Sequence, residues 1–550
     1  MIPNSDQSMA ERLFTTAEMY PDMPALDYFG KQITYQHLQE KIQRLAMIWK
    51  NLGIEPGHRV IVCLPNIPEV VMTIYSLNMI GAVVCIVHPL STAPEMSFYV
   101  QDTQSQWLIT LDILYGNFRK AVEESDIKKT ILTTVSGELP PIPRYLYYLK
   151  QGRKSPNYHG DRLIDWKTLI RNWLSPLKVF HHFSTDQPAV ILFSGGTTGS
   201  PKGVLLSNQN MNALADQVLT QVNPQPGKDS TLCILPLFHG FGLGICLHSV
   251  LLGGGRCILI PRFSKKEFID AIAKCKPTYI AGVPTHYEAL INSEKLQKAQ
   301  FSYLKGAFCG GDSVPLSLIK RFNDFMQSHG GIVSLREGYG LTECVTACSI
   351  MPEDIYKERS VGLPLPGNRF KIVRPQGIEE VPVGEVGEIC INGPTVMLGY
   401  NNRPEETDRV LQKHKDGLIW LSTGDLGTLD QDGFLYFTGR MKRIIKCSGY
   451  AVYPSQVESV INSHPLVVES CVIGIPDEYT MSRVKAYVVI RGNVHSREKL
   501  AEEIKQSVAE QLIKWSVPTE ITFLDSLPVT RMEKADYRAL EAMERGEAII

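Results

Sequence analysis

The sequence predicts an α/β fold, and three observations support that prediction. Apolar strand-like runs alternate with amphipathic helix patterns up to about Thr346. Short β-rich runs separated by turn signals follow, and a helix, a strand and a second helix complete the chain. The first pattern is typical of parallel sheets covered by helices, and the second of an antiparallel subdomain.

The first elements are expected between residues 35 and 87. Residues 35–52 should form a helix that ends before Gly53, because their apolar side chains repeat every three or four positions. Residues 59–64 form a β-branched run typical of a buried strand. Pro68 should begin the next helix, and residues 82–87 the next strand. The side chains on the first helix face are Leu38, Ile42, Leu45, Trp49 and Leu52.

Later elements follow from the same patterns. Further strands of the α/β layers are expected at 189–193, 258–261, 278–282 and 307–309, and antiparallel strands at 369–373, 387–391 and 433–438. The last module should contain a helix at 454–463, a strand at 484–490 and a helix at 497–515.

Composition excludes several classes of protein. Lys and Arg number 56 against 57 Asp and Glu, so there is no basic surplus for nucleic acid. The 12 Cys include no CxxC pair, which favours reduced thiols and a cytoplasmic protein. Neither a signal peptide nor an apolar run of membrane-spanning length is expected. Residues 140–154 mix aromatic and basic side chains, which suits either a solvated loop or a peripheral membrane contact.

A loop rich in glycine and hydroxyl groups follows the strand expected at 189–193. It reads Ser194-Gly195-Gly196-Thr197-Thr198-Gly199-Ser200-Pro201-Lys202-Gly203. Glycines let backbone N–H groups close around an anion, and Lys202 adds positive charge. Because Gly203 rather than Ser or Thr follows Lys202, this is not a Walker A motif. The loop predicts a phosphate-binding site.

With five later motifs, this loop resembles the signature of adenylate-forming, AMP-binding enzymes, which include acyl-CoA synthetases, non-ribosomal adenylation domains and luciferases. The resemblance covers nearly the whole chain. It implies a large N-terminal domain (1–439) of layered α/β subdomains plus a β-rich subdomain, and a small mobile C-terminal α+β domain (440–550). The motifs are PLFHGFG (236–242), GYGLTE (338–343), STGDL (422–426), GRMKRIIKCSGY (439–450) and LPVTRMEK (527–534).

The resemblance also implies a reaction and the residues that carry it. A carboxylate attacks ATP to give an acyl-adenylate and pyrophosphate, and coenzyme A then displaces AMP. Catalytic roles fall to His239, Thr342, Glu343 and Lys534, with Mg²⁺ on Glu343. The ATP or AMP site comprises Ser194, Gly195, Gly196, Thr197, Thr198, Gly199, Lys202, Gly310, Gly311, Tyr339, Gly340, Thr342, Asp425 and Arg440.

The remaining implied roles concern the hinge, the thiol and the acid. Lys442 matches the hinge about which the C-terminal domain turns between the half-reactions. The sequence differs from the family pattern at Glu533, where the family usually has Gly. This difference concerns the geometry of the loop around Lys534. Lys446 and Gly449 would line the coenzyme A side, and the acyl pocket would be formed by Phe241, Gly242, Gly282, Val283 and Cys309.

The sequence favours a medium- or long-chain fatty acid as substrate. No Asp follows His239 where amino-acid-activating relatives place one, and residues 280–285 and 309–311 are small and mostly apolar, which suits an aliphatic tail. The stretch 144–154 also resembles a segment of long-chain fatty acyl-CoA synthetases. An aryl acid of the coumarate or benzoate type stays open as the substrate.

The acceptor of the acyl group is expected to be coenzyme A. The short run between Glu343 and Val361 leaves no room for the insertion found in relatives that load a carrier protein, which disfavours an acyl-AMP ligase of that kind. A catalytically silent nucleotide-binding protein, a membrane scaffold and a luciferase-type oxidase also remain open as functions. Both a monomer and a homodimer are compatible with the sequence.

Overall fold

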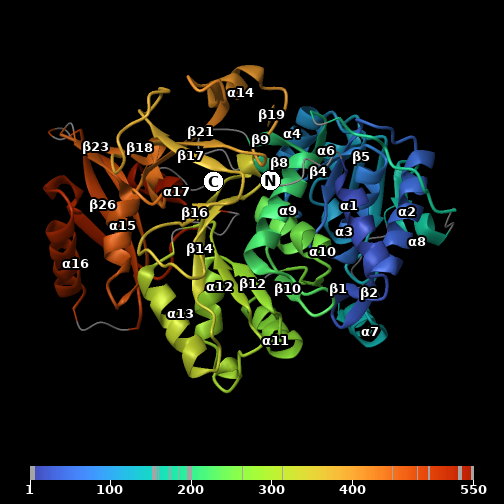
Figure 1. Cartoon of the computed structure of the whole chain (residues 1–550), viewed down its shortest axis with the longest axis horizontal. Helices are drawn as coiled ribbons and strands as arrows, with labels where there is room; N and C mark the ends of the chain where they lie inside the picture. Colours follow the sequence, from blue (N-terminus) through green and yellow to red (C-terminus); the bar gives the residue numbers. More distant parts are fainter. Residues whose placement is uncertain are drawn as a thin grey trace.

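The structure is a computed structural model that describes residues 7–150, 158, 160–171, 175–184, 186–194, 201–262, 264–312, 314–448, 450–477, 479, 481–492, 496–530 and 535–546. Figure 1 shows the N-terminal segments on the right, in blue, and the C-terminal segments on the left, in red. The segments between them, in green and yellow, connect the two sides.

One mostly parallel sheet carries the strand before the glycine-rich loop. β8, β4, β3, β5, β6 and β7 are parallel, while β9 and β19 are antiparallel at one edge. The alternation of β-branched runs with helices therefore gives the predicted parallel layer. In spatial order the strands are β19 (Gly399–Tyr400), β9 (Lys202–Ser207), β8 (Pro188–Ser194), β4 (Val83–Ile86), β3 (Arg59–Cys63), β5 (Trp107–Leu111), β6 (Lys129–Thr133) and β7 (Leu163–Asp165).

A second sheet follows the same rule. Its strands from β14 to β1 are parallel, and β15, β16 and β2 add antiparallel edges. In spatial order they are β16 (Leu363–Pro364), β15 (Ala347–Ile350), β14 (Leu335–Gly340), β13 (Gly306–Cys309), β12 (Tyr279–Gly282), β10 (Ser230–Cys233), β11 (Arg256–Leu259), β1 (Pro24–Tyr28) and β2 (Lys31–Thr34).

Helices connect and cover these strands. α3 is buried along its whole length, as expected for a helix between packed layers, and it packs against α1 and α2. The helices up to residue 344 are α1 (Met9–Met19), α2 (Tyr35–Asn51), α3 (Pro68–Met79), α4 (Ala93–Thr103), α5 (Asp112–Tyr115), α6 (Arg119–Glu123), α7 (Pro141–Lys150), α8 (Trp166–Arg171), α9 (Asn208–Val222), the π-helix η2 (Phe241–Ser249), α10 (Val250–Leu252), α11 (Lys265–Cys275), α12 (Pro284–Ile291), η3 (Glu294–Leu296), α13 (Leu316–Ser328) and η4 (Thr342–Cys344).

The β-rich subdomain is an antiparallel sheet, as predicted. β21 pairs with β18, β20 and β22, so it organises the sheet. The elements are β17 (Arg369–Val373), β18 (Gly387–Asn392), α14 (Pro404–Val410), β20 (Leu411–Lys413), β21 (Ile419–Leu429) and β22 (Leu435–Arg440).

The C-terminal part has its own hydrophobic core, which Val457, Val472, Val484 and Ile504 help to form. Its main sheet pairs β25 antiparallel and β27 parallel to β26. The elements are η5 (Met441–Arg443), β23 (Ile445–Cys447), β24 (Tyr450–Val452), α15 (Pro454–Asn462), β25 (Val467–Asp477), β26 (Met481–Ile490), α16 (Arg497–Gln511), η6 (Lys514–Ser516), β27 (Glu520–Leu524) and α17 (Tyr537–Glu544).

Two expectations about helices were wrong. The helix expected at 497–515 ends at Gln511, because Leu512 takes an extended backbone (φ −128°, ψ 169°) and packs on the C-terminal core outside the helix. The solvated-loop interpretation is wrong for residues 141–150, because Pro141–Lys150 is helical, and residues 151–154 lie outside the described part of the chain. Pro141 stands at the first helical position, where its missing N–H costs nothing.

Candidate functional site

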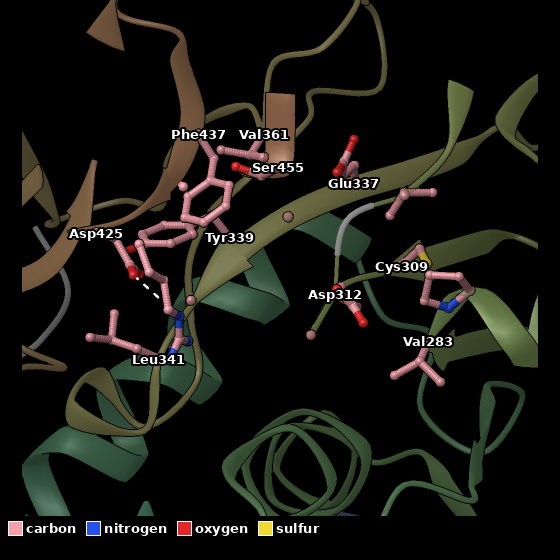
Figure 2. Close-up of a pocket in the computed structure, with 18 of the residues that line it drawn as sticks. Val283, Cys309, Asp312, Glu337, Tyr339, Leu341, Val361, Asp425, Phe437 and Ser455 are labelled. Carbon is pink, nitrogen blue, oxygen red and sulfur yellow. Dashed lines mark hydrogen bonds and ion pairs between the residues drawn. The ribbon is translucent and has the colours of Figure 1, made fainter. Parts of the chain in front are cut away.

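A cavity of about 1860 Å³ lies where both large sheets, the β-rich subdomain and the C-terminal part meet. In Figure 2, Tyr339, Phe437 and Asp425 lie on one side of the pocket, and Val283, Cys309 and Asp312 on the other. Predicted residues from distant segments line this one cavity: Ser194, Lys202, His239, Phe241, Val283, Cys309, Gly310, Gly311, Tyr339, Gly340, Thr342, Glu343, Asp425, Arg440 and Lys442.

Some predicted residues lie elsewhere. Gly242 and Gly282 are not among the residues that line the cavity: an added Cβ would lie 2.2 Å from the Pro236 carbonyl oxygen and 2.8 Å from His286 Nδ1, respectively. Lys446 lines a smaller pocket of about 320 Å³ that Lys442 also borders. The predicted residues outside the described part of the chain are Gly195, Gly196, Thr197, Thr198, Gly199, Gly449 and Lys534.

The two ends of the glycine-rich loop are fixed by an antiparallel strand pair. Ser194 at the end of β8 stands opposite Lys202 at the start of β9. The Lys202 ammonium pairs with the Glu406 carboxylate on α14 and lies 4.7 Å from the centre of the Tyr400 ring. The sheet therefore presents Ser194 and Lys202 to the cavity from neighbouring strands.

The GYGLTE motif passes through a crowded turn after β14. A Cβ on Gly340 would lie 1.6 Å from the Thr346 carbonyl oxygen, so no side chain fits there. Val345 takes a left-handed φ of 64°, which is uncommon for a β-branched residue. This turn places Thr342 and Glu343 on η4, at the cavity wall.

Glu343 is the predicted metal ligand. Its Oε1 accepts a hydrogen bond from the Tyr400 hydroxyl at 2.8 Å. Within the described ranges, no group of three or more His, Cys, Asp and Glu side chains is arranged to hold a metal ion. A single carboxylate at a cavity wall fits Mg²⁺ that takes its other ligands from substrate phosphates and water, which is how Mg²⁺ is usually bound.

Asp425 is held by neighbouring side chains at the cavity wall. The Tyr339 hydroxyl donates to Asp425 Oδ2 at 2.8 Å, and Arg440 Nε lies 3.4 Å from Oδ1. Arg440 stands directly opposite Asp425 in the register of β21 and β22. A carboxylate offers about four acceptor positions, so it can accept from several donors at once.

The aromatic ring of Tyr339 is only 8% exposed and lies 5.9 Å from the ring of Phe437. Burial, with the neighbouring Asp425 carboxylate adding to it, raises the pKa of Tyr339 well above its usual value. The phenol therefore stays a hydrogen-bond donor at neutral pH, and the two rings, which are tilted by 31°, give this part of the cavity an aromatic wall.

The expected acyl side of the cavity is mostly apolar. Phe241 and Ile245 come from η2, Val283 from the end of β12, and Cys309 from β13. Burial raises the pKa of the Cys309 thiol well above its usual value, so it stays neutral. Further apolar lining comes from Val218, Val222, Ala289, Leu318 and Ile319.

Among the cavity residues that the sequence did not predict are Glu337, Tyr400, Phe437 and Ser455. Burial raises the pKa of Glu337 to about 8, although a hydrogen bond from the Val314 backbone opposes the shift. Glu337 stands directly before the GYG triplet, which is the one signal that could have marked it. The other three lie in strands or at a helix start whose sequences carry no anion-binding pattern.

Comparison with known proteins gives consistent similarities. A family model described as "AMP-binding enzyme" matches residues 13–401, and one described as "AMP-binding enzyme C-terminal domain" matches residues 456–534. The long-chain-fatty-acid–CoA ligase of Escherichia coli is 32% identical, with 99% of this chain and 96% of that protein covered. The enzyme of the same name from Bacillus subtilis is 33% identical, covering 98% and 95%.

Two further similarities concern an aryl-acid enzyme and a solved structure. A probable 4-coumarate–CoA ligase from Dictyostelium discoideum is 30% identical over 89% of this chain and 84% of its own length. The crystal structure of an ATP-bound RpMatB–BxBclM chimera superposes with a TM-score of 0.85 at 26% identity, covering 98% of this chain and 99% of the other.

Proposed function

Because this chain belongs to the AMP-binding enzyme family, we propose that it is an ATP-dependent acyl-CoA ligase that activates a carboxylic acid through an acyl-adenylate and transfers the acyl group to coenzyme A. The observation that carries the proposal is the convergence of Lys202, Glu343 and Asp425 on one cavity. These residues lie far apart in the sequence, and together they offer a cation, a metal ligand and a ribose acceptor.

The first half-reaction joins two anions, so it needs positive charge and fixed donors at the α-phosphate. Ser194 and Lys202, with Thr197 and Thr198, would bind the β- and γ-phosphates. Thr342 would donate to the α-phosphate, and Lys534 would approach both the carboxylate and the α-phosphate. His239 at the start of the apolar wall would orient the acid. The other loop residues in this role are Gly195, Gly196 and Gly199.

The opposite wall would hold the nucleoside. Tyr339 would present its ring to adenine, and Gly310 and Gly311 would leave space beside it, while Gly340 would let the chain turn closely past Thr346. Asp425 would accept the ribose hydroxyls while Arg440 fixes its orientation.

Glu343 would hold Mg²⁺ together with phosphate oxygens of the substrate. The ion would supply charge that neutralises the leaving pyrophosphate. Tyr400 keeps the Glu343 carboxylate oriented through its hydroxyl hydrogen bond.

The second half-reaction requires the thiol of coenzyme A at the same carbon. We propose that residues 440–550 turn about Lys442 between the two steps, since Lys534 and the thiol cannot occupy one position together. Lys446 and Gly449 would then face the pantetheine arm. The division into residues 1–439 and 440–550 belongs to this proposal.

We propose a medium- or long-chain fatty acid as the acid. The apolar wall of Phe241, Val283 and Cys309 supports an aliphatic tail, and two relatives at 32% and 33% identity are named long-chain-fatty-acid–CoA ligases. Gly242 and Gly282 would act indirectly, by letting the Pro236 backbone and the His286 side chain, respectively, approach closely behind that wall.

An aryl-acid CoA ligase is the second candidate, because a relative at 30% identity is named a probable 4-coumarate–CoA ligase. The test is a panel of fatty and aryl acids with ATP, Mg²⁺ and coenzyme A. Pyrophosphate release and mass spectrometry of the thioester are the measurements. Fatty acyl-CoA products are expected. Coumaroyl-CoA alone would support the second candidate, and pyrophosphate without thioester would indicate an acyl-AMP ligase.

We further propose a peripheral membrane contact through α7, whose Ile142, Tyr145 and Leu149 are exposed. They recur at helical spacing, so they face one side. Within the described residues, no helix combines the length and apolarity required to cross a bilayer.

A further inference from the structure

We propose that Glu406 is a displaceable counter-ion for Lys202, holding the lysine in place without nucleotide and competing with phosphate for it. Glu406 would thereby weaken binding of ATP and of pyrophosphate. The inference deepens the proposed function and rests on it, because it takes Lys202 as a phosphate ligand.

The first support is the contact itself. The Lys202 ammonium pairs directly with Glu406 Oε2, and the two side chains are only 28% and 34% exposed. Lys202 is the one positively charged residue in the sequence of the phosphate loop. In the structure its ammonium group is paired with a carboxylate of the same chain. An incoming phosphate oxygen would have to share or replace this partner.

The second support is how Glu406 is positioned. It lies in the first turn of α14, which begins at Pro404 directly after the edge strand β19. Arg403 Nη1 lies 3.7 Å from Glu406 Oε1, and Arg403 Nη2 lies 3.8 Å from Asp102 Oδ1. These contacts hold Glu406 beside β9, on which Lys202 lies.

The third support is the charge around the pair. The hydrogen bond from Lys202 is the main cause that lowers the pKa of Glu406, so Glu406 stays ionised at neutral pH. Burial and the repulsion of Lys202 and Arg538 lower the pKa of Lys442, while Glu406 opposes that shift. The Glu406 carboxylate therefore contacts the phosphate-loop cation directly and also acts electrostatically on the cation of the proposed hinge.

This arrangement has a consequence for product release. Once pyrophosphate has formed, Glu406 can pair with the Lys202 ammonium again. This pairing lowers the free energy required for pyrophosphate to dissociate. A partly exposed ion pair of this kind changes binding by about two- to fivefold. Glu406 acts through Lys202 and is thus a positioning residue.

The test measures binding of MgATP and of magnesium pyrophosphate to the full chain by calorimetry. Glu406→Gln is expected to tighten both by about two- to fivefold. Glu405→Gln is the matched control, since Glu405 occupies the same helical turn, is 89% exposed and faces only Arg409 at 4.0 Å. It should leave both affinities unchanged. In a Lys202→Gln background, the effect of Glu406→Gln should disappear.

The inference would be overturned if Glu406→Gln left the affinities for MgATP and magnesium pyrophosphate unchanged or weakened them. It would also be overturned if Glu405→Gln tightened binding to the same extent, or if Glu406→Gln still tightened binding in the Lys202→Gln background. These outcomes differ from failure of the proposed function. A wild-type chain that binds ATP but makes no acyl-CoA contradicts the proposed function alone, and a wild-type chain that binds no ATP contradicts both.

Discussion

At the scale of the residue, neighbours decide what a side chain can do. Asp425 follows a glycine, and in isolation Gly424-Asp425 is also a turn signal. In the fold, Asp425 is 5% exposed and held by Tyr339 and Arg440. Burial together with these two partners is more than a turn residue needs, which supports the proposal that Asp425 binds the ribose.

Lys534 is predicted to serve only the first half-reaction. Lys534→Ala should slow pyrophosphate exchange by about 100- to 1000-fold, the usual cost of removing one charged donor at a transition state. Thioester formation from supplied acyl-adenylate should stay near wild type, because that step has no carboxylate–phosphate repulsion to relieve. Lys499→Ala on α16, at a side chain that is 80% exposed, is the control. An equal loss in both steps would contradict this division of roles.

Glu69 on α3 predicts a pH dependence of stability. It is 1% exposed, its Oε2 has no hydrogen-bond partner among the described residues, and burial raises its pKa to about 8 despite Lys31 and Lys41 nearby. The folded chain keeps this proton to about pH 8, while the unfolded chain releases it near 4.5. Its contribution to the free energy of unfolding therefore falls as pH rises between these values.

Glu69→Gln should remove this contribution to the pH dependence. Because glutamine stays neutral, the variant should gain stability relative to wild type by about 1–3 kcal/mol between roughly pH 5 and pH 8. The measurement is the unfolding temperature of both chains at each pH. Parallel curves for the two chains would show that Glu69 does not titrate in this range.

Among the elements, α7 is the clearest case in which the structure resolves an ambiguous sequence, because the segment could have been a loop and is a helix. Arg144 Nε donates to the Ser136 carbonyl at 3.1 Å and its other guanidinium nitrogen to the Gly137 carbonyl, which ties the helix to the preceding turn. Ile142 and Tyr145 are left 75% and 63% exposed. An exposed apolar helix face next to basic residues suits the surface of an anionic membrane.

The membrane contact can be tested with vesicles of anionic phosphatidylglycerol. Ile142→Ser combined with Tyr145→Ser should lower the co-sedimenting fraction at least about fivefold, because the apolar area that enters the lipid is lost. Ile332→Ser is the control, since Ile332 is 95% exposed outside this helix. Equal effects of both changes, or no binding by the wild type, would exclude α7 as a docking element.

In the molecule as a whole, residues of the N-terminal sheets and of the C-terminal part line the cavity together. Thr530 and Ala535, on either side of the segment that contains Lys534, line it. Arg491 at the end of the C-terminal sheet reaches Glu288 on α12, with its Nη2 at 3.1 Å from Oε1. We interpret this placement as the arrangement for adenylation.

The Arg491–Glu288 contact is predicted to favour that arrangement. Arg491→Gln should slow pyrophosphate exchange by about two- to fivefold, as expected for a partly exposed ion pair, and should leave thioester formation from acyl-adenylate unchanged or faster. Glu288 keeps Arg321 and Asn292 as partners, so the N-terminal part should not lose stability. Arg374→Gln is the control, at a residue 75% exposed and paired with Glu379. Equal slowing of both half-reactions would contradict a conformational role.

Local patterns in the sequence were enough to predict the types of helix and strand and the resemblance to AMP-binding enzymes. Periodicity placed α2 and the strand Arg369–Val373 correctly, because one-sided burial imposes a repeat that is readable locally. Gly53 ends α2 with a φ of 81°, as its position predicted. The motifs around Lys202, Glu343 and Asp425 were also readable, since each is contiguous in the chain.

The side chains that these motifs contact could not be predicted without the folded structure. Three contacts join segments that are far apart in the sequence: Glu406 with Lys202, Tyr400 with Glu343, and Arg491 with Glu288. No local sequence pattern indicates that these segments lie close together in space. Helix ends such as Gln511 were likewise set by packing, because the burial of Leu512 on a core outweighs local helix preference. Local patterns encode which face of an element is buried, whereas contacts between faces depend on how the whole chain folds.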